Sequence, residues 1–262
     1  MSRKTRYDVI IIGGGVVGTA ILRALSRLRL SSLLLEKAVE IGWGTTKANS
    51  GIVHAGFHST PGSWKAKLSV AGNRMFDQLC DELDVPFWRN GLLMVARSKE
   101  EERILKQYYQ QGLENGVEGM KILDAEATHR REPNLAPEIS LSLWAPSGAV
   151  VAPFELAMAQ AENAIANGAQ LHTGLAVTDI IHTEEGFAVT TDDGTSWTAP
   201  YLVNSAGLFA DDLARMCGLD VEPIIPRKGE EYLFDQRVSN LVTHTIFPVP
   251  TPNSKGILVI PT

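Results

Sequence analysis

Several features that mark particular protein classes are scarce in this 262-residue chain. Its two cysteines, Cys80 and Cys217, lie far apart in no paired motif, which excludes a disulfide framework and a thiolate metal site. This scarcity favours a reducing, cytoplasmic location. The 24 basic residues are fewer than the 30 acidic ones, so no basic patch for nucleic acid is evident. The 44% hydrophobic and 21% charged content is that of a globular protein with a full-sized core.

The chain also lacks a long hydrophobic run. Basic residues precede an apolar stretch over residues 9–22, as they do in a signal peptide. However, Asp8 directly precedes the stretch, glycines interrupt it, and no small-residue cleavage site follows. The stretch is also too short to span a bilayer. We therefore expect neither a leader peptide nor a membrane-spanning helix here.

The N-terminal region does contain a glycine-rich turn. The elements predicted around it are a buried strand, an amphipathic helix and a second strand, over residues 7–12, 16–28 and 33–36. Gly13, Gly15 and Gly18 have the G-x-G-x-x-G spacing where the first strand meets the helix. Gly13 permits the tight turn, Gly15 lets a pyrophosphate approach the backbone, and Gly18 allows close contact between helix and strand. The spacing therefore predicts a dinucleotide site, although such a turn can also serve packing alone.

Glu36 and the loop after it extend this prediction. Glu36 ends the second strand, where a carboxylate can accept both hydroxyls of an adenosine ribose, or else it is a solvated strand end. The glycine motif does not distinguish NAD from FAD. The following loop is small, polar and punctuated by glycine, which favours a second phosphate and a ribityl chain over an ordinary connection. Its candidate cofactor-binding residues are Gly44, Thr45, Thr46, Asn49, Ser50 and Gly51.

The rest of the chain alternates between helix and strand. Helices are predicted over residues 64–83, 99–114, 154–166 and 209–216. Strands are predicted over residues 86–96, 170–173, 177–182, 187–191, 201–204 and 256–260, whereas residues 132–153 are only locally extended. In the helix over residues 64–83, Trp64, Leu68 and Met75 are expected on the packed side. The sequence shows no repeat or linker, so we expect a second domain to be interleaved with the first, in a fragment of a longer protein.

Seven stretches resemble the FAD-dependent oxidoreductases of the D-amino-acid-oxidase type. Three of them are typical of that superfamily: V-I-I-I-G-G-G-V-V-G at residues 9–18, L-L-L-E-K at residues 33–37 and L-V-N-S-A-G-L-F-A-D at residues 202–211. Two more, at residues 45–56 and 61–68, are similar to the branch of FAD-dependent glycerol-3-phosphate dehydrogenases and L-2-hydroxyglutarate oxidases. Within this branch, R-K-G-E-E-Y-L and S-K-G-I-L-V-I-P-T favour the glycerol-3-phosphate side, at residues 227–233 and 254–262.

The resemblance implies an α/β fold with a Rossmann-type FAD-binding domain, interleaved with an α+β mixed-sheet substrate domain. The FAD-binding domain is expected over residues 1–85 and 151–222, and the substrate domain over residues 86–150 and 223–262. FAD is the implied cofactor, with Glu36 on the adenosine ribose. The same motifs add Lys37, Ala206 and Gly207 to the cofactor-binding residues.

The resemblance also implies a reaction. A hydride passes from a substrate carbon that bears a hydroxyl to flavin N5, while a base takes the hydroxyl proton. His54 matches the family's histidine beside the flavin and is the expected base; its other interpretation is a histidine that only packs there. His54 and His58 have a metal-like i, i+4 spacing, but Gly51 and Gly56 oppose a helix, so no metal site is expected.

The expected substrate is a small anionic secondary alcohol, with glycerol 3-phosphate first and L-2-hydroxyglutarate, or another hydroxy or amino acid, second. His58 and Ser59 stand where better-known glycerol-3-phosphate dehydrogenases carry arginine then tyrosine, which weakens the case for a phosphate anchor. His58, Arg227 and Lys228 are weak candidates for substrate binding; the basic pair also suits a solvated strand edge. The electron acceptor, whether quinone, oxygen or a redox partner, stays open, as do peripheral contact with the inner face of the membrane and a non-catalytic electron-transfer role.

Overall fold

The computed structural model describes residues 5–251, 254 and 256–261. The chain forms two compact units whose segments interleave in the sequence. Unit 1 comprises the described part of Met1–Asn49, with Leu83–Val85 and Ala152–Glu230. Unit 2 comprises Ser50–Glu82, Pro86–Val151 and the described part of Glu231–Thr262.

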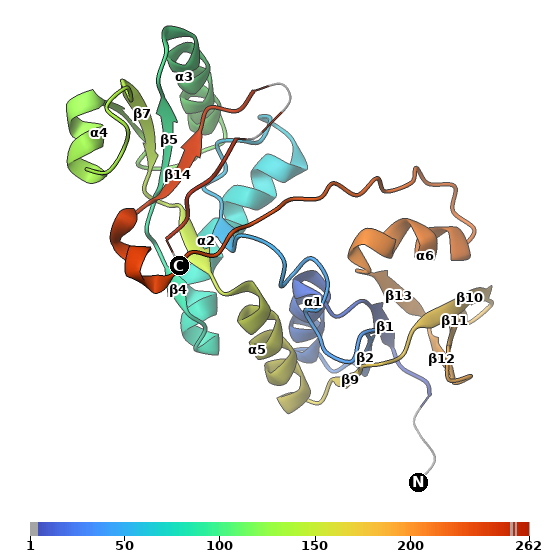
Figure 1. Cartoon of the computed structure of the whole chain (residues 1–262). Helices are drawn as coiled ribbons and strands as arrows, with labels where there is room; N and C mark the ends of the chain where they lie inside the picture. The colour runs from blue at the N-terminus through green and yellow to red at the C-terminus, as the bar shows by residue number, and fades with distance from the viewer. Residues whose placement is uncertain (1–4, 252–253, 255, 262) are drawn as a thin grey trace. The chain divides into compact units, whose positions relative to one another are not determined.

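Unit 1 is built on a four-stranded parallel sheet with the order β13-β1-β2-β9 (Figure 1). The predicted strand–helix–strand unit is present as β1 (Val9–Ile12), α1 (Val16–Ser26) and β2 (Ser32–Leu35). Every residue of β1 and β2 is buried, because layers of side chains cover both faces of the sheet. The flanking strands come from much later in the chain, β9 (Gln170–His172) and β13 (Tyr201–Asn204).

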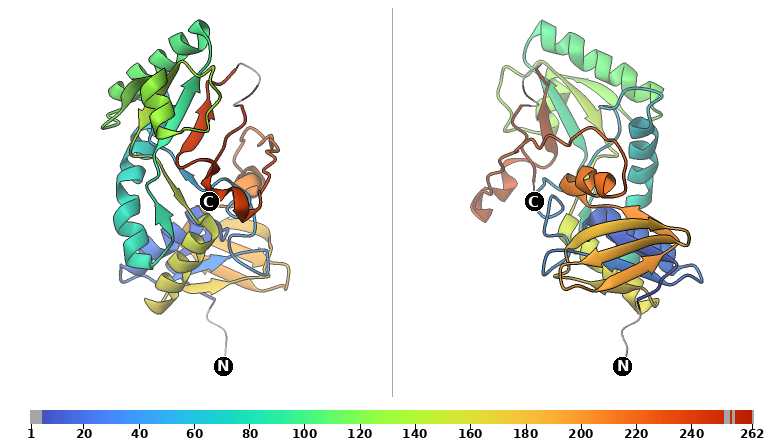
Figure 2. Two further views of the ribbon diagram at one scale, coloured as in Figure 1. Left: turned by 60° about the vertical axis from the view of Figure 1, so that its left-hand side comes forward. Right: turned by 90° about the vertical axis from the view of Figure 1, so that its right-hand side faces the viewer.

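The two faces of this parallel sheet have different covers. On one face, α1 packs against α5 (Pro153–Ala166). The apolar side chains of these two helices form one cluster with Ile11 and Leu34 of the sheet. On the other face, Trp197 is fully buried against side chains of β1 and β2. Trp197 belongs to the antiparallel sheet in the foreground of the right view of Figure 2, which comprises β10 (Val177–Thr183), β11 (Gly186–Thr191) and β12 (Ser196–Ala199). The 3-10 helix η1 (Gly207–Phe209) and α6 (Ala210–Met216) follow β13.

Unit 2 contains a mixed sheet with the order β14-β5-β7-β6, in which β14 runs parallel to β5 and the other pairs are antiparallel. Its strands are β5 (Leu92–Ala96), β6 (Lys121–Asp124), β7 (Leu141–Ala145) and β14 (Thr245–Pro248). Leu92 and Met94 pack with Leu105 of α3 (Lys99–Glu114), whereas Leu93 and Val95 belong to a second cluster. This alternation shows that both faces of the central strand are covered.

A smaller antiparallel sheet and three further helices complete unit 2. The sheet has the order β3-β8-β4 and joins β3 (Ile52–Val53), β8 (Ala149–Val151) and β4 (Phe87–Trp88). The helices are α2 (Trp64–Leu83), α4 (Ala125–Arg131) and the 3-10 helix η2 (Gln236–Leu241). None of the helices in the described part of the chain is long and apolar enough to cross a bilayer.

The helix over residues 64–83 has the predicted bounds, but the prediction of its packed side was wrong. Trp64, Leu68 and Met75 are exposed, at 75%, 64% and 63%. The buried side chains are instead Ala66, Val70, Asn73 and Cys80. The reason is tertiary contact, since Val70 packs close to Gly56 and Asn73 donates hydrogen bonds to the carbonyl oxygens of His54 and Ser147. Tertiary hydrogen bonding therefore decides the orientation of α2 against its apolar stripe.

Several other expectations differ from the structure. Residues 132–153, expected to be only locally extended, contain β7 and β8, because β5 supplies a pairing partner for β7. No element is predicted over residues 121–131, where the structure has β6 and α4. The expected strand over residues 256–260 contributes an isolated bridge between Ile246 and Val259; Lys255 and Thr262 of that motif lie outside the described residues. Residues 219–235 form no strand, so Arg227 and Lys228 are not on a strand edge. Residues 50–82 lie in unit 2 and residues 223–230 in unit 1, unlike the expected domain segments.

Candidate functional site

The glycine turn of unit 1 is held by tight backbone contacts at two of its three positions. Gly13 has φ +108°, a conformation that favours glycine, and a Cβ there would lie 2.4 Å from the carbonyl oxygen of Ser205. A Cβ on Gly18 would lie 1.9 Å from the carbonyl oxygen of Gly13 and 2.7 Å from Ser205 Oγ. The turn and the close approach of α1 to β1 therefore require glycine at both positions, as the spacing predicts.

Gly15 differs, because packing does not require a glycine there. It precedes α1 with φ −77° and ψ 177°, which any residue adopts. Within the described part of the chain, the one atom within 4 Å of a Cβ at this position is Thr46 Oγ1, at 3.1 Å. This sparsely contacted position lies at the positive end of the α1 dipole, where a phosphate is favoured. A side chain here would fill space that a bound pyrophosphate needs, so the turn fits the cofactor.

The buried hydroxyl of Thr46 extends this arrangement. Thr46 Oγ1 accepts a hydrogen bond from the backbone N–H of Val16 at 3.0 Å, which satisfies a donor in the first turn of α1. Asn49 Nδ2 donates to the carbonyl oxygens of Thr45 and Thr46, at 3.0 and 2.6 Å. The loop after β2 is thus held against the start of α1 by Thr46 and shaped by Asn49.

Two other predicted loop residues lie in the second unit. Gly44 and Thr45 are exposed in unit 1, whereas Ser50 and Gly51 belong to unit 2. The carbonyl oxygen of Gly51 accepts the N–H of Val151 at 2.9 Å, next to the pairing of β3 with β8. The structure therefore brings Thr46 to the glycine turn, with Thr45 and Asn49 bound to each other in the same loop. In the ranges that the structure describes, Gly44 of unit 1 has no hydrogen bond to the turn, and Ser50 and Gly51 lie in unit 2, directly before β3.

Glu36 occupies the end of β2 beside the glycine turn. Its Oε2 accepts the N–H of Gly14 at 2.6 Å and its Oε1 accepts the N–H of Ala38 at 2.8 Å. Two backbone donors fix the carboxylate in place, and each oxygen keeps a lone pair for a further donor. This arrangement fits a ribose whose two hydroxyls both donate.

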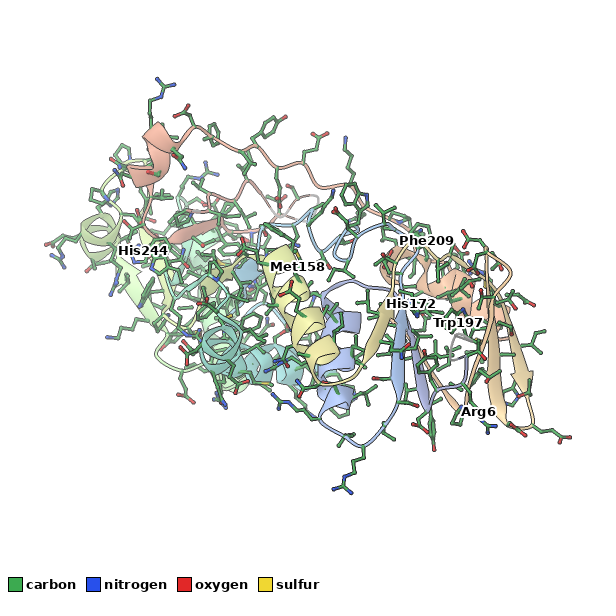
Figure 3. All side chains as sticks on the ribbon, turned by 90° about the horizontal axis from the view of Figure 1, so that it is seen from below. Arg6, Met158, His172, Trp197, Phe209 and His244 are labelled. Carbon is green, nitrogen blue, oxygen red and sulfur yellow. The ribbon has the colours of Figure 1, made fainter. Side chains whose placement is uncertain are left out.

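A pocket of about 180 Å³ opens beside Glu36. Lys37 Nζ lies 3.0 Å from the centroid of the Phe209 ring, which is labelled in Figure 3, so an aromatic face and a cation meet at its wall. Asp212 also lines the pocket and is paired with Arg215 at 2.8 Å. The remaining lining is mostly apolar and comprises Ile12, Gly13, Leu35, Leu175, Ala176, Val177, Ala206, Leu213 and Met216. Apolar walls and one fixed carboxylate suit an adenosine moiety.

Part of this pocket is formed by residues that no sequence motif indicates. Leu175, Val177 and Met216 line it, but in the sequence they are ordinary apolar residues near predicted strands and a helix. Ala206, one of the expected cofactor-binding residues, lines the pocket, and Gly207 begins η1 with φ +58°. Phe209 could have been found, because it lies in the stretch at residues 202–211 that resembles the superfamily.

The histidine loop, defined as residues 54–59, lies in unit 2 directly after β3. His54 is exposed, and its ring centroid lies 5.6 Å from that of His58 and 5.9 Å from that of Phe247. His58 is half-buried, and its ring centroid lies 4.0 Å from that of Phe57 and 5.6 Å from that of Tyr108. The loop therefore presents one imidazole outward and keeps the other within an aromatic cluster, so the two differ in their access to a substrate.

The remaining candidates for substrate binding are not part of this loop. Arg227 and Lys228 are exposed in unit 1, and Lys228 forms an ion pair with Glu230 at 2.7 Å. Ser59, which is the last residue of the histidine loop, is buried. The structure thus places the basic pair and His54 in different units.

Comparison with known proteins assigns the chain to a family. The family model described as FAD dependent oxidoreductase (DAO) matches residues 8–262. The chain belongs to this family, which confirms the predicted family membership and FAD as its cofactor.

Individual relatives agree with this assignment. The chain is 43% identical to a glycerol 3-phosphate dehydrogenase of Caloramator mitchellensis, over 98% of this chain and 53% of that protein. It is 32% identical to a mitochondrial L-2-hydroxyglutarate dehydrogenase of Nematostella vectensis, over 94% of this chain and 57% of that protein. Its structure matches an FAD-bound L-alpha-glycerophosphate oxidase from Mycoplasma pneumoniae with a TM-score of 0.84 and 28% identity, over 99% of this chain and 69% of that one. The predicted α/β fold is confirmed, and the chain spans little more than half the length of the two curated relatives.

Proposed function

We propose that the protein containing this chain is an FAD-dependent dehydrogenase or oxidase that oxidises a secondary alcohol on a small anionic substrate. The observation that carries the proposal is the sparsely contacted position at Gly15, where among the described residues a Cβ would meet one atom, Thr46 Oγ1, at the start of α1. The fixed carboxylate of Glu36 and the adjoining pocket support the same site. When bound, FAD supplies the acceptor for the two electrons of the oxidation.

The chain's own residues have separate roles in the proposed reaction. The turn around Gly15, together with the loop at Thr46, holds the pyrophosphate, and Glu36 accepts hydrogen bonds from the adenosine ribose. His54 takes the hydroxyl proton of the substrate, since an imidazole titrates near neutral pH and this one is exposed at the end of β3. A positioned general base contributes typically about 10² to 10⁴ in rate.

Glycerol 3-phosphate, oxidised to dihydroxyacetone phosphate, is the first substrate. The 43% identity to a protein named glycerol 3-phosphate dehydrogenase supports it. L-2-hydroxyglutarate is the second, favoured by the half-buried His58 where better-known glycerol-3-phosphate dehydrogenases carry an arginine. The electrons leave to a quinone, oxygen or a redox protein.

The decisive experiment is anaerobic flavin reduction in the purified chain. We expect a visible flavin spectrum that bleaches when glycerol 3-phosphate is added. Bleaching by L-2-hydroxyglutarate alone would move the assignment to the second substrate. A flavin that stays oxidised with both would contradict an oxidation reaction and leave an electron-transfer role. A colourless protein would contradict FAD retention by this chain.

A histidine substitution tests the proposed base. His54→Ala should slow single-turnover flavin reduction by about 10² to 10⁴ while FAD binding is unchanged. His182→Ala is the matched control, because His182 is exposed on β10 and stacks edge-on against Phe187. Unchanged reduction in His54→Ala would remove His54 from the chemistry.

A further inference from the structure

Carboxamide side chains from two helices hold the backbone of the histidine loop. Asn73 Nδ2 of α2 donates to the carbonyl oxygen of His54 at 3.0 Å. From α3, Gln111 Nε2 donates to the carbonyl oxygen of Phe57 at 2.7 Å. Asn115, which caps the end of α3, donates through Nδ2 to the carbonyl oxygens of Gly56 and Ser59, at 3.0 and 2.7 Å. Four of the six carbonyls in the histidine loop are therefore bound by three amides, which we call the carboxamide clamp.

This arrangement matters because the backbone of the histidine loop forms no hydrogen bonds of a helix or a β-sheet. It leaves β3 after Val53 and continues as turns and irregular backbone. Gly56 has φ +110°, and a Cβ there would lie 2.6 Å from a methyl group of Val70 on α2. The conformation that presents His54 is thus set by side chains of α2 and α3 rather than by regular secondary structure.

The orientation of the Asn73 amide is itself fixed. Arg89 Nη1 donates to Asn73 Oδ1 at 3.1 Å, so the oxygen end of the carboxamide is already satisfied by a cation. The NH₂ end must then face the carbonyl oxygens of His54 and Ser147, the second at 2.8 Å. Asp77 in turn accepts from Arg89 Nε at 2.8 Å, which keeps the guanidinium in place. A rotated Asn73 amide would place an N–H against the guanidinium and an oxygen against two carbonyls.

We propose that the carboxamide clamp is a positioning device for the His54 imidazole. Asn73 fixes the backbone at His54 itself, whereas Gln111 and Asn115 fix the return of the histidine loop. The inference rests on the proposed function, in which His54 takes the substrate's proton. A displacement of a reacting group by about 1 Å can cost on the order of 10²-fold in rate. Loss of a clamp bond should therefore slow proton transfer more than it weakens substrate binding.

The test is a double-variant cycle measured by single-turnover reduction of the FAD-loaded protein with glycerol 3-phosphate. Asn73→Ala should slow reduction about 10- to 100-fold with the substrate dissociation constant changed less than about threefold. In a His54→Ala background the same substitution should have no further effect on the rate. Gln111→Met removes one donor at nearly the same side-chain length, and keeps the test available if Asn73→Ala does not fold.

Asn134→Ala is the matched control. Its amide also donates to a backbone carbonyl of unit 2, that of Leu241 at 2.9 Å, but outside the histidine loop. A readout independent of turnover is the NMR signal of the His54 ring in FAD-free protein. We expect this signal to shift or broaden in Asn73→Ala and Gln111→Met, and to be unchanged in Asn134→Ala.

The outcomes separate the two proposals. Parent-like reduction in Asn73→Ala and Gln111→Met, with slow reduction in His54→Ala, would overturn the positioning role and leave His54 as the base. Rate losses that multiply in the double variant would also overturn it, because the clamp residue would then act independently of His54. Parent-like reduction in His54→Ala would overturn the proposed function of His54, and the positioning role with it.

Discussion

Gly15 and Gly18 stand three residues apart, yet their substitution should affect different properties. Gly18→Ala places a Cβ 1.9 Å from the backbone oxygen of Gly13, so the backbone itself must move. Overpacking of this kind costs about 1–3 kcal/mol. Since about 1 kcal/mol lowers the Tm of a protein of this size by about 2–4 °C, we expect the Tm to fall by about 2–12 °C.

At Gly15 the fold should tolerate a side chain. A Cβ meets Thr46 Oγ1 at 3.1 Å, and the backbone at φ −77° is compatible with any residue. Alanine in place of glycine before a helix costs about 1 kcal/mol or less, which lowers the Tm by no more than about 4 °C. Gly15→Val should also fold, but its branched side chain fills the space of the pyrophosphate, so the purified protein should lose its FAD.

The assay combines two measurements on each variant. Thermal unfolding of the FAD-free protein reports the fold, and flavin absorbance per chain reports cofactor retention. A full complement of FAD in Gly15→Val would refute the placement of the pyrophosphate. Equal Tm losses for Gly15→Ala and Gly18→Ala in the absence of FAD would refute the claim that packing does not require glycine at position 15.

Three further predictions concern single side chains. Thr46→Val removes the hydroxyl that accepts the N–H of Val16, so the free energy of unfolding should fall by about 0.5–2 kcal/mol in urea titrations, whereas Thr46→Ser should match the parent. The hydrogen bonds from Arg89 lower the pKa of Asp77 below its usual 3.8; this contribution to stability is present above about pH 4 and is lost as the pH falls through the lowered pKa. Asp77→Asn should therefore flatten the acid side of the stability profile, and an unchanged profile would contradict the pairing. Burial, reinforced by the charge of Asp77, raises the pKa of the Cys80 thiol to about 11. Iodoacetamide at about pH 8 should therefore modify Cys80 on the order of 100-fold more slowly in the folded protein than in the protein unfolded by urea. Equal rates in the two states would contradict this burial.

Elements defined by local signals were predictable from the sequence. The helix over residues 99–114 has its predicted bounds, because Ser98 caps it by accepting the N–H of Glu101 and acidic residues fill its first turn. The strand–helix–strand unit around Gly13 and Gly18 likewise depends on residues adjacent in the sequence. By contrast, β7 forms because it pairs with β5, in a register that places Leu92 opposite Ala145, and no local pattern indicates that partner.

The same distinction applies to the candidate sites. The glycine turn and Glu36 lie within one short stretch, so their arrangement could be predicted. The pocket wall at Val177 and Phe209 comes from separate elements that the fold brings together. Asn73 and Gln111 look like ordinary polar positions on helices, and their contacts with the histidine loop follow only from the packing of α2 and α3.

The parallel pairing of β1 with β13 has a consequence for how the protein is made. Val9 lies beside Tyr201 in this ladder, so one edge of β1 has no partner until synthesis has passed β13. At about 5–20 residues per second, the ribosome needs roughly 10–40 s to produce the chain between them. Throughout this interval Ile10 and Ile11, fully buried in the finished sheet, adjoin an open strand edge on the nascent chain. We therefore expect closure of β13 onto β1 to be a late folding step, and the nascent protein to depend on chaperones until it occurs.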